Sequence, residues 1–160
     1  MTRRLTFWLL GVLLLGLSPG VYAQTPAHTN SPLFHFGIRW GDGLTLEYQG
    51  LVSGTAFGLD QRLVERLSAV PASFALVRRY QTVDAWGNGL LLGGLGLAVG
   101  GVLVANVGGS NSGSVVTATV LTGLAGVLVG NLLQTAAQQL AARAADAFNE
   151  VVLSSLSKAP

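Results

Sequence analysis

The stretch GNGLLLGGLGLAVGGVLVANVGG, residues 87–109, decides the fold of this protein, because it joins many glycines to apolar residues and carries no charge. It lies in a longer uncharged stretch, since no charged residue occurs between Asp84 and Arg143. Two apolar segments, 86–107 and 115–133, each come near the ~20 residues with which a helix spans a bilayer. The segment GGSNSGS between them has the composition of a turn. The sequence therefore predicts a transmembrane helical hairpin.

Small residues recur along both spans with helical spacing. In the first span the glycines follow steps of four, three and four, and the second span repeats these steps thirty residues later. Small residues on one face let two helices approach closely and gain van der Waals contacts. The predicted helix-packing residues are Gly89, Gly93, Gly96, Gly100, Thr119, Gly123, Gly126 and Gly130. We expect the two faces to pack on each other, on a second copy, or both.

A second line of small residues on the first span offers another face for close approach. It consists of Gly94, Gly101, Ala105 and Gly108. A dinucleotide-binding loop is the rival interpretation of this glycine-rich segment. That fold needs an acidic residue some twenty positions further on, and none occurs before Asp146. The chain also lacks an alternating strand and helix pattern, so we reject this alternative.

The N-terminal segment MTRRLTFWLLGVLLLGLSPGVYAQT has the three parts of a secretory signal peptide. Arg3 and Arg4 form its positive end, and the apolar core at 7–17 is shorter than the ~20 residues that span a bilayer. Small residues precede a cleavage site after Ala23. We predict a signal peptide at 1–23, with an uncleaved anchor as the alternative, and export of the chain that follows.

The composition favours a lipid environment. Half of the residues are hydrophobic and 10% are charged, whereas a soluble domain has about a quarter of its residues charged. Without Arg3 and Arg4, seven basic residues balance seven acidic ones, so nucleic acid is not an expected partner. The absence of cysteine excludes disulfides, thiolate metal sites and an acylated cysteine anchor.

Between the signal and the hairpin we expect a linker at 24–31 and an extracytoplasmic region at 32–84. The segments LFHFGIRW and LTLEYQ alternate in polarity on either side of Gly41-Asp42-Gly43, which predicts a β-hairpin. An outer-membrane β-barrel is the alternative, but no later stretch continues the alternation.

Two helices are predicted between this β-hairpin and the first span. GLDQRLVERLSAV places Leu63, Val64 and Leu67 on one helical face, with Asp60 as the N-cap. Pro71 is suited to begin the next helix, which runs into the glycine segment without a breaker.

After the second span, residues 134–160 are predicted as a C-terminal amphipathic helix and tail. Its apolar stripe comprises Leu133, Ala137, Leu140, Ala144, Phe148 and Val151. We expect this helix to pack in a small extracytoplasmic core. Docking on the lipid surface or on the helix at 71–84 is the alternative.

No catalytic or metal-binding set can be assembled from the sequence. The two histidines, His28 and His35, lie in the linker and the first strand, and the acidic residues are dispersed. Asn88, Asn106 and Asn131 are the polar residues of the spans, and we expect them to bond between helices rather than to line a polar path. We therefore predict no enzymatic activity, no cofactor and no metal.

The layout resembles that of uncharacterised small bacterial envelope proteins with a glycine-zipper transmembrane hairpin. The segments that carry this resemblance are SAVPASFALVRRYQTVDAWGNGLLLGG and AARAADAFNE, and it covers residues 43–150. It supports an architecture and implies no activity.

Together these observations predict a mainly α membrane protein. It has a glycine-rich two-helix transmembrane hairpin at 85–133, a small N-terminal β-hairpin and flanking helices. Its expected role is self-association or membrane scaffolding of a partner, with an oligomeric pore or a membrane-perturbing protein as the alternative. The expected partners are the lipid bilayer and a second copy or another membrane protein. The expected location is the cell envelope, with the inner membrane favoured over the outer membrane.

Overall fold

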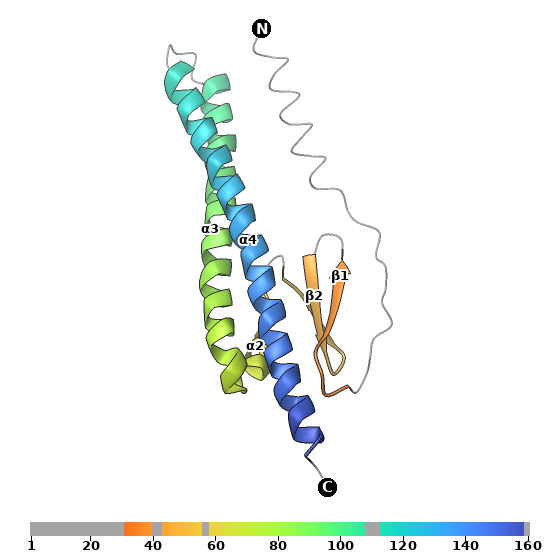
Figure 1. The fold of residues 1–160 in the computed structure, drawn as a ribbon. Helices are drawn as coiled ribbons and strands as arrows, with labels where there is room; N and C mark the ends of the chain where they lie inside the picture. Colours follow the sequence, from red (N-terminus) through yellow and green to blue (C-terminus); the bar gives the residue numbers. More distant parts are fainter. Residues whose placement is uncertain (1–30, 40–42, 56–57, 108–112, 159–160) are drawn as a thin grey trace.

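Two long helices and a small sheet make up the architecture in the computed structural model, which describes residues 31–39, 43–55, 58–107 and 113–158. Helices α3, Pro71–Val107, and α4, Gly113–Leu156, lie side by side and antiparallel (Figure 1). The sheet lies beside the C-terminal half of α4, near the start of α3. The predicted signal peptide, most of the predicted linker and the expected turn at Gly41-Asp42 lie outside the described residues.

The sheet is antiparallel and has three strands among the described residues, in the order β1-β2-β3. These are β1, His35–Arg39, β2, Gly43–Tyr48, and β3, Leu51–Gly54. The two predicted strands pair with each other in a register that sets Phe36 opposite Leu46. The predicted β-hairpin is therefore part of a larger sheet, and β3 was not predicted.

A tight turn connects β2 to β3. Tyr48 pairs with Leu51, so only Gln49 and Gly50 lie between the strands. Both have positive φ, 49° and 79°, which is the backbone pattern of the two-residue type I′ turn that suits the twist of a β-hairpin. Glycine adopts this conformation freely, whereas glutamine rarely does.

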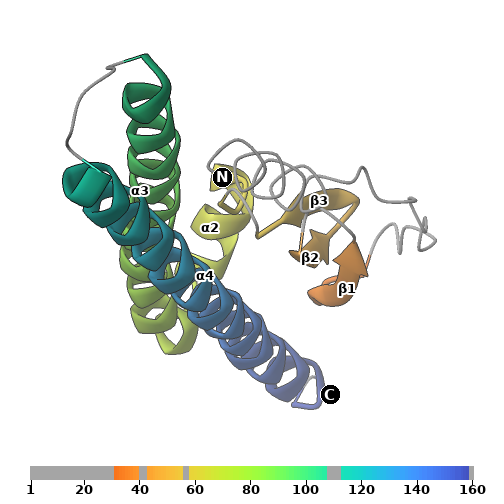
Figure 2. The same cartoon turned by 90° about the horizontal axis from the view of Figure 1, so that it is seen from above.

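The short helix α2, Gln61–Ser68, forms as the sequence predicts. The Asp60 side chain accepts a hydrogen bond of 2.7 Å from the backbone N–H of Arg62, and so caps the helix. Leu63 and Leu67 are fully buried on its inner face. Viewed from above, α2 lies between the long helices and the sheet (Figure 2).

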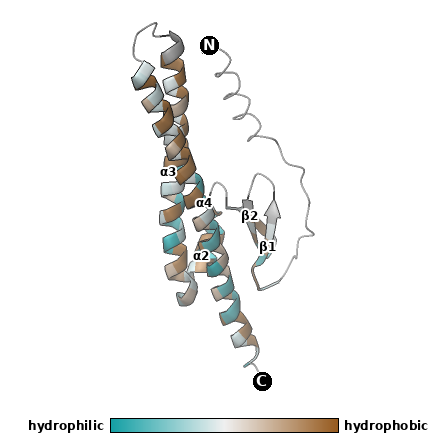
Figure 3. Cartoon of the chain, turned by 45° about the horizontal axis from the view of Figure 1, so that its top comes forward, coloured by the Kyte–Doolittle hydropathy of each residue, from teal (hydrophilic) through white to brown (hydrophobic). Residues whose placement is uncertain are grey.

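Helices α3 and α4 run through the boundaries predicted between membrane and flanking segments. Pro71 is the first residue of α3, and the predicted C-terminal helix is the second half of the 44-residue α4. Figure 3 shows that hydrophobic residues dominate the halves near the connection between them, whereas hydrophilic residues gather in the other half. Each helix therefore combines an apolar half with an amphipathic half.

The hydrophobic core lies in the amphipathic half, where the sheet, α2, α3 and α4 meet. Its buried members are Phe34, Leu46, Leu63, Leu67, Val77, Tyr80, Ala137, Ala141, Ala144, Ala145 and Phe148. The C-terminal part of α4 thus packs in a small protein core, as expected.

Three aromatic rings and one amide attach the sheet to α4. The Phe34 ring lies 4.6 Å from that of Tyr48 and 5.0 Å from that of Phe148, measured between centroids. The Asn149 side chain pairs with the backbone of Phe34 as a strand would: its Oδ1 accepts from the Phe34 N–H at 2.7 Å, and its Nδ2 donates to the Phe34 C=O at 2.9 Å. These contacts hold the sheet against the C-terminal half of α4. We call this end of the molecule, which comprises the sheet, α2, the start of α3 and the end of α4, the base.

Candidate functional site

The apolar halves of α3 and α4 approach each other so closely that several contact points have no room for a side chain. A Cβ added to Gly123 would lie 2.5 Å from the Ala98 nitrogen and 2.6 Å from the Gly94 oxygen. One added to Gly130 would lie 2.7 Å from the Leu91 nitrogen. Real Cβ atoms do not reach such distances to backbone, so glycine is required at these positions. The hairpin is thus held by backbone-to-backbone packing.

The predicted line on the second span faces α3. Gly123, Gly126 and Gly130 contact its backbone, and Thr119 contacts Gly101. On α3 the second line fills this role, because Gly94 and Gly101 contact α4. The side chain of Ala105 and residue Gly108, also in that line, fall outside the described part of the structure.

The first line on α3 does not face α4. A Cβ added to any of its members meets no other atom within 4 Å, apart from the backbone of its own helix. These members are Gly89, Gly93, Gly96 and Gly100. Of the expected alternatives, packing on the other span is therefore not seen for this line, and packing on a second copy stays a prediction. Adjacent residues are rotated by about 100° around a helix, so Gly93 faces away from α4 when Gly94 faces it. A glycine face consequently lies on the outside of the hairpin.

A heptad pattern, missed in the sequence, identifies the inward residues of α3. Steps of three and four lead from the core into the glycine segment, through Val77, Tyr80, Asp84, Gly87, Leu91, Gly94, Ala98 and Gly101, all buried or half-buried. The same steps lead along α4 through Gly123, Val127, Gly130, Gln134, Ala137, Ala141, Ala144 and Phe148. Such a repeat keeps one seam of each helix facing its neighbour. When this repeat is extended from Val77 along the sequence, it selects the line with Gly94 and Gly101, which contacts α4.

Large apolar side chains cover the outside of the hairpin. Leu92, Leu128 and Leu132 are 70%, 66% and 71% exposed, and Trp86 is 66% exposed. Two helical stretches of the described chain, Pro71–Val104 and Gly113–Leu156, are long and apolar enough to cross a membrane. Only 22% and 11% of their most apolar windows is buried within the protein. Small residues inside and large apolar residues outside are typical of helices packed in lipid.

A polar cluster joins the helices where the apolar half begins. Gln134 Nε2 donates to Asn88 Oδ1 at 2.7 Å, and Asn88 Nδ2 donates to Asp84 Oδ2 at 3.2 Å. Gly87 makes room for this cluster, since its added Cβ would lie 3.3 Å from Gln134 Cγ. Gln134 is 5% exposed, and its Oε1 and Asp84 Oδ1 find no donor among the described residues. The cluster is therefore a buried polar contact that is only partly satisfied.

Ionisable groups of α3 next to this cluster have perturbed pKa values. Asp84 lies just outside the predicted span, and burial raises its pKa, opposed by the amides of Gln134 and Asn88. Tyr80 has its pKa raised to about 12 by burial and by the charge of Asp84. The Tyr80 hydroxyl oxygen accepts from the Leu59 N–H at 2.7 Å. The charge on Asp84 therefore opposes folding at neutral pH.

Asp84→Asn is expected to raise the thermal unfolding temperature at pH 7. Because the folded pKa lies above the unfolded one, the wild type is most stable while Asp84 is protonated and loses that stability as the pH rises through the folded pKa. The amide that replaces the Asp84 carboxyl carries no charge at any pH. The stability gained over the wild type should therefore vanish below the ordinary pKa of an aspartate. Asp146→Asn, an exposed change on α4, is the control. A variant less stable than wild type at pH 7 would contradict this account.

The structure does not group the three asparagines of the predicted spans, or the two histidines, into one site within the described residues. Asn88 takes part in the polar cluster, Asn131 is exposed on α4, and the side chain of Asn106 falls outside the described part. His35 lies in β1, and His28 precedes the first described residue. In the part of the chain that the structure describes, no three His, Asp or Glu side chains are grouped so as to hold a metal ion.

No family model matches the chain, and comparison with curated proteins and with solved structures gives no significant match. The site is therefore defined by its own geometry: a helical hairpin with one glycine face used internally, a second glycine face left outside, and an apolar surface around both.

Proposed function

We propose that this protein is an integral membrane protein of the cell envelope whose hairpin self-associates through the outer glycine face of α3. This face is defined by Gly89, Gly93, Gly96 and Gly100. The single observation that carries the proposal is that a Cβ added to any of these four glycines meets open space. A Cβ added to the inward glycines would instead meet the backbone of the opposite helix, as it does at Gly87, Gly94, Gly123, Gly126 and Gly130. The fold of one chain therefore does not need them.

The surroundings of the outer glycine face support a lipid environment. Leu92 and Leu97, next to it on α3, are 70% and 49% exposed. In water, glycine in a helix costs about 1 kcal/mol relative to alanine, and a large exposed apolar surface promotes aggregation. In a bilayer the helix has no water with which to exchange its hydrogen bonds, and a groove of glycines allows a second helix to pack closely. A second copy carries the same groove and can meet it symmetrically.

The predicted signal peptide and the even number of predicted spans support a location for the base of the molecule. A signal peptide exports the chain that follows, and two spans return it to the side from which it entered. The start of α3 and the end of α4 lie at the same end of the hairpin (Figure 1). We propose that the sheet and α2 lie on the exported side, that the inner membrane holds the hairpin, and that the protein has no enzymatic role.

The test of self-association compares Gly96→Leu with Leu92→Ile. A Cβ added at Gly96 meets no other atom within 4 Å apart from the backbone of its own helix, so Gly96→Leu should fill the outer glycine face and leave the contact with α4 unchanged. We expect the hairpin to fold normally while the dissociation constant of the dimer rises at least about tenfold. Leu92→Ile keeps an apolar side chain outside this face and should change little. The measurement is energy transfer between labelled copies in vesicles, at several ratios of protein to lipid. Equal transfer in both variants would contradict the proposal.

A further inference from the structure

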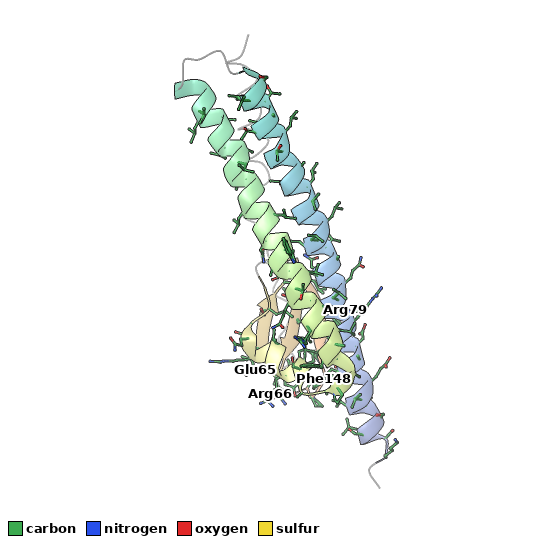
Figure 4. All side chains as sticks on the ribbon, turned by 90° about the vertical axis from the view of Figure 1, so that its left-hand side faces the viewer. Glu65, Arg66, Arg79 and Phe148 are labelled. Atoms are coloured by element: carbon green, nitrogen blue, oxygen red, sulfur yellow. The ribbon has the colours of Figure 1, made fainter. Side chains whose placement is uncertain are left out.

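A basic hollow lies on the surface of the long helices, outside the core and the glycine faces. It has a volume of about 520 Å³ and is lined by Arg78, Arg79, Thr82 and Val83 of α3 and by Leu140 of α4. Figure 4 shows Arg79 on the lower part of α3, beyond the apolar half of the hairpin. The hollow therefore combines two guanidinium groups with an apolar floor.

The charges of this hollow are uncompensated. No acidic residue lines it, and neither guanidinium makes an ion pair or hydrogen bond with another described residue. The guanidinium carbon of Arg78 lies 6.0 Å from the centre of the Phe74 ring, which gives that side chain a surface to rest on. Asp84 belongs to the inner seam of α3 and faces the polar cluster. The arrangement is complementary to an anion with several acceptor oxygens, such as a phosphate.

The position of the hollow along α3 matches the headgroup region of a bilayer that surrounds the apolar half of the hairpin. Arg79 precedes Trp86 by seven residues, which at 1.5 Å per residue is about 10 Å along the helix. The polar region on each side of the ~30 Å hydrocarbon core is about 5–8 Å thick, and arginine side chains extend several ångströms toward it. Trp86, 66% exposed, marks the boundary as interfacial tryptophans do. Val83 lies between Arg79 and Trp86 along α3, and Leu140 of α4 lines the same hollow.

We propose that the hollow binds an anionic phospholipid. Arg78 and Arg79 hold the phosphate of its headgroup, and its acyl chain lies along Val83 and Leu140 toward the apolar surface of the hairpin. The inference rests on the proposed insertion of the hairpin in a membrane. It also accounts for two arginines next to a span on the exported side, where basic residues are usually scarce.

The experiment uses the full chain in nanodiscs made of phosphatidylcholine with a minor fraction of phosphatidylglycerol. Lipids that remain bound after transfer to detergent are counted by native mass spectrometry. We expect phosphatidylglycerol to be enriched over phosphatidylcholine, and the double variant Arg78→Gln/Arg79→Gln to lose roughly thirtyfold of that preference, about fivefold per arginine. The matched control is Arg62→Gln/Arg66→Gln, which removes the same charge from the exposed face of α2.

The outcomes test the lipid site and distinguish its failure from a failure of the proposed membrane insertion. Loss of the preference only in the Arg78/Arg79 variant supports the lipid site. Equal loss in the control variant, or equal retention in all three proteins, overturns it, because attraction would then depend on net charge or be absent. Displacement of the lipid by millimolar inorganic phosphate also overturns it in favour of a free-anion site. If the wild type is released from phosphatidylcholine vesicles by carbonate, the proposed function fails as well; if it stays inserted, only the lipid site is at stake.

Discussion

Gly123→Leu is expected to separate the apolar halves of α3 and α4. Even the first carbon of the new side chain would lie 2.5 Å from the Ala98 nitrogen and 2.6 Å from the Gly94 oxygen. Both are backbone atoms, which cannot turn aside as a side chain does. Extra methylenes in a well-packed core typically cost about 1–3 kcal/mol where neighbours can adjust. Here the neighbours are backbone atoms, so leucine can be accommodated only if the two helices move apart. We expect the variant to be made in low yield and to be cleaved within the hairpin by protease.

Alanine at the same position gives a graded and better controlled version of this test. Gly123→Ala should lower the free energy of unfolding by about 1–3 kcal/mol. Gly96→Ala, in open space on the same hairpin, should not lower it and should gain up to about 1 kcal/mol from helix propensity. The measurement is thermal unfolding of the purified chain in detergent, followed by circular dichroism. Similar changes at the two positions would show that the glycines act through propensity and not through packing.

The local elements of this fold follow from the sequence because short-range chemistry determines them. The side chain of Asp60 caps α2 by accepting a hydrogen bond from the N–H of Arg62, which is only two residues further on. Pro71 begins α3 at a position where its missing N–H has no cost. The length of α3 and α4 follows from apolar segments without a breaker. These features need no knowledge of distant contacts.

The choice between the two glycine lines of α3 depends on tertiary structure. Gly93 and Gly94 are equally small, and either line satisfies a rule based on spacing alone. What selects Gly94 is the packing of Val77 and Tyr80 in the core half, because a continuous helix carries that orientation upward in steps of three and four. The sequence contains this information, but only once the core half of α3 is recognised as the reference.

The third strand and the attachment of the sheet were beyond prediction for different reasons. The turn before β3 uses Gln49 where Asn or Asp is usual, so the local signal for a β-hairpin is weak. The Asn149 side chain bonds to Phe34 across 115 positions of sequence, and a polar residue on an amphipathic helix gives no sign of such a partner. The polar cluster of Asp84, Asn88 and Gln134 is likewise visible only when α3 and α4 are side by side.

The largest difference between a membrane hairpin and a soluble one should appear in the accessibility of its outer surface. Leu92 and Leu128 are 70% and 66% exposed in the isolated chain, so in water a cysteine at either position would react freely. In a bilayer both positions lie in hydrocarbon, where a charged maleimide does not enter and a thiol is not ionised. The chain has no cysteine of its own, so every label reports one chosen position.

Labelling of single-cysteine variants in intact bacterial cells therefore tests the central claim most directly. A membrane-impermeant maleimide that reaches the exported side should label Gln81→Cys and Glu150→Cys, both exposed at the base. It should leave Leu92→Cys and Leu128→Cys unlabelled until the membrane and the fold are dissolved in dodecyl sulfate. Protection of the base positions until the cells are permeabilised would reverse the proposed topology. Labelling of the two hairpin positions as fast as Gln81→Cys would contradict insertion, and with it the proposed function.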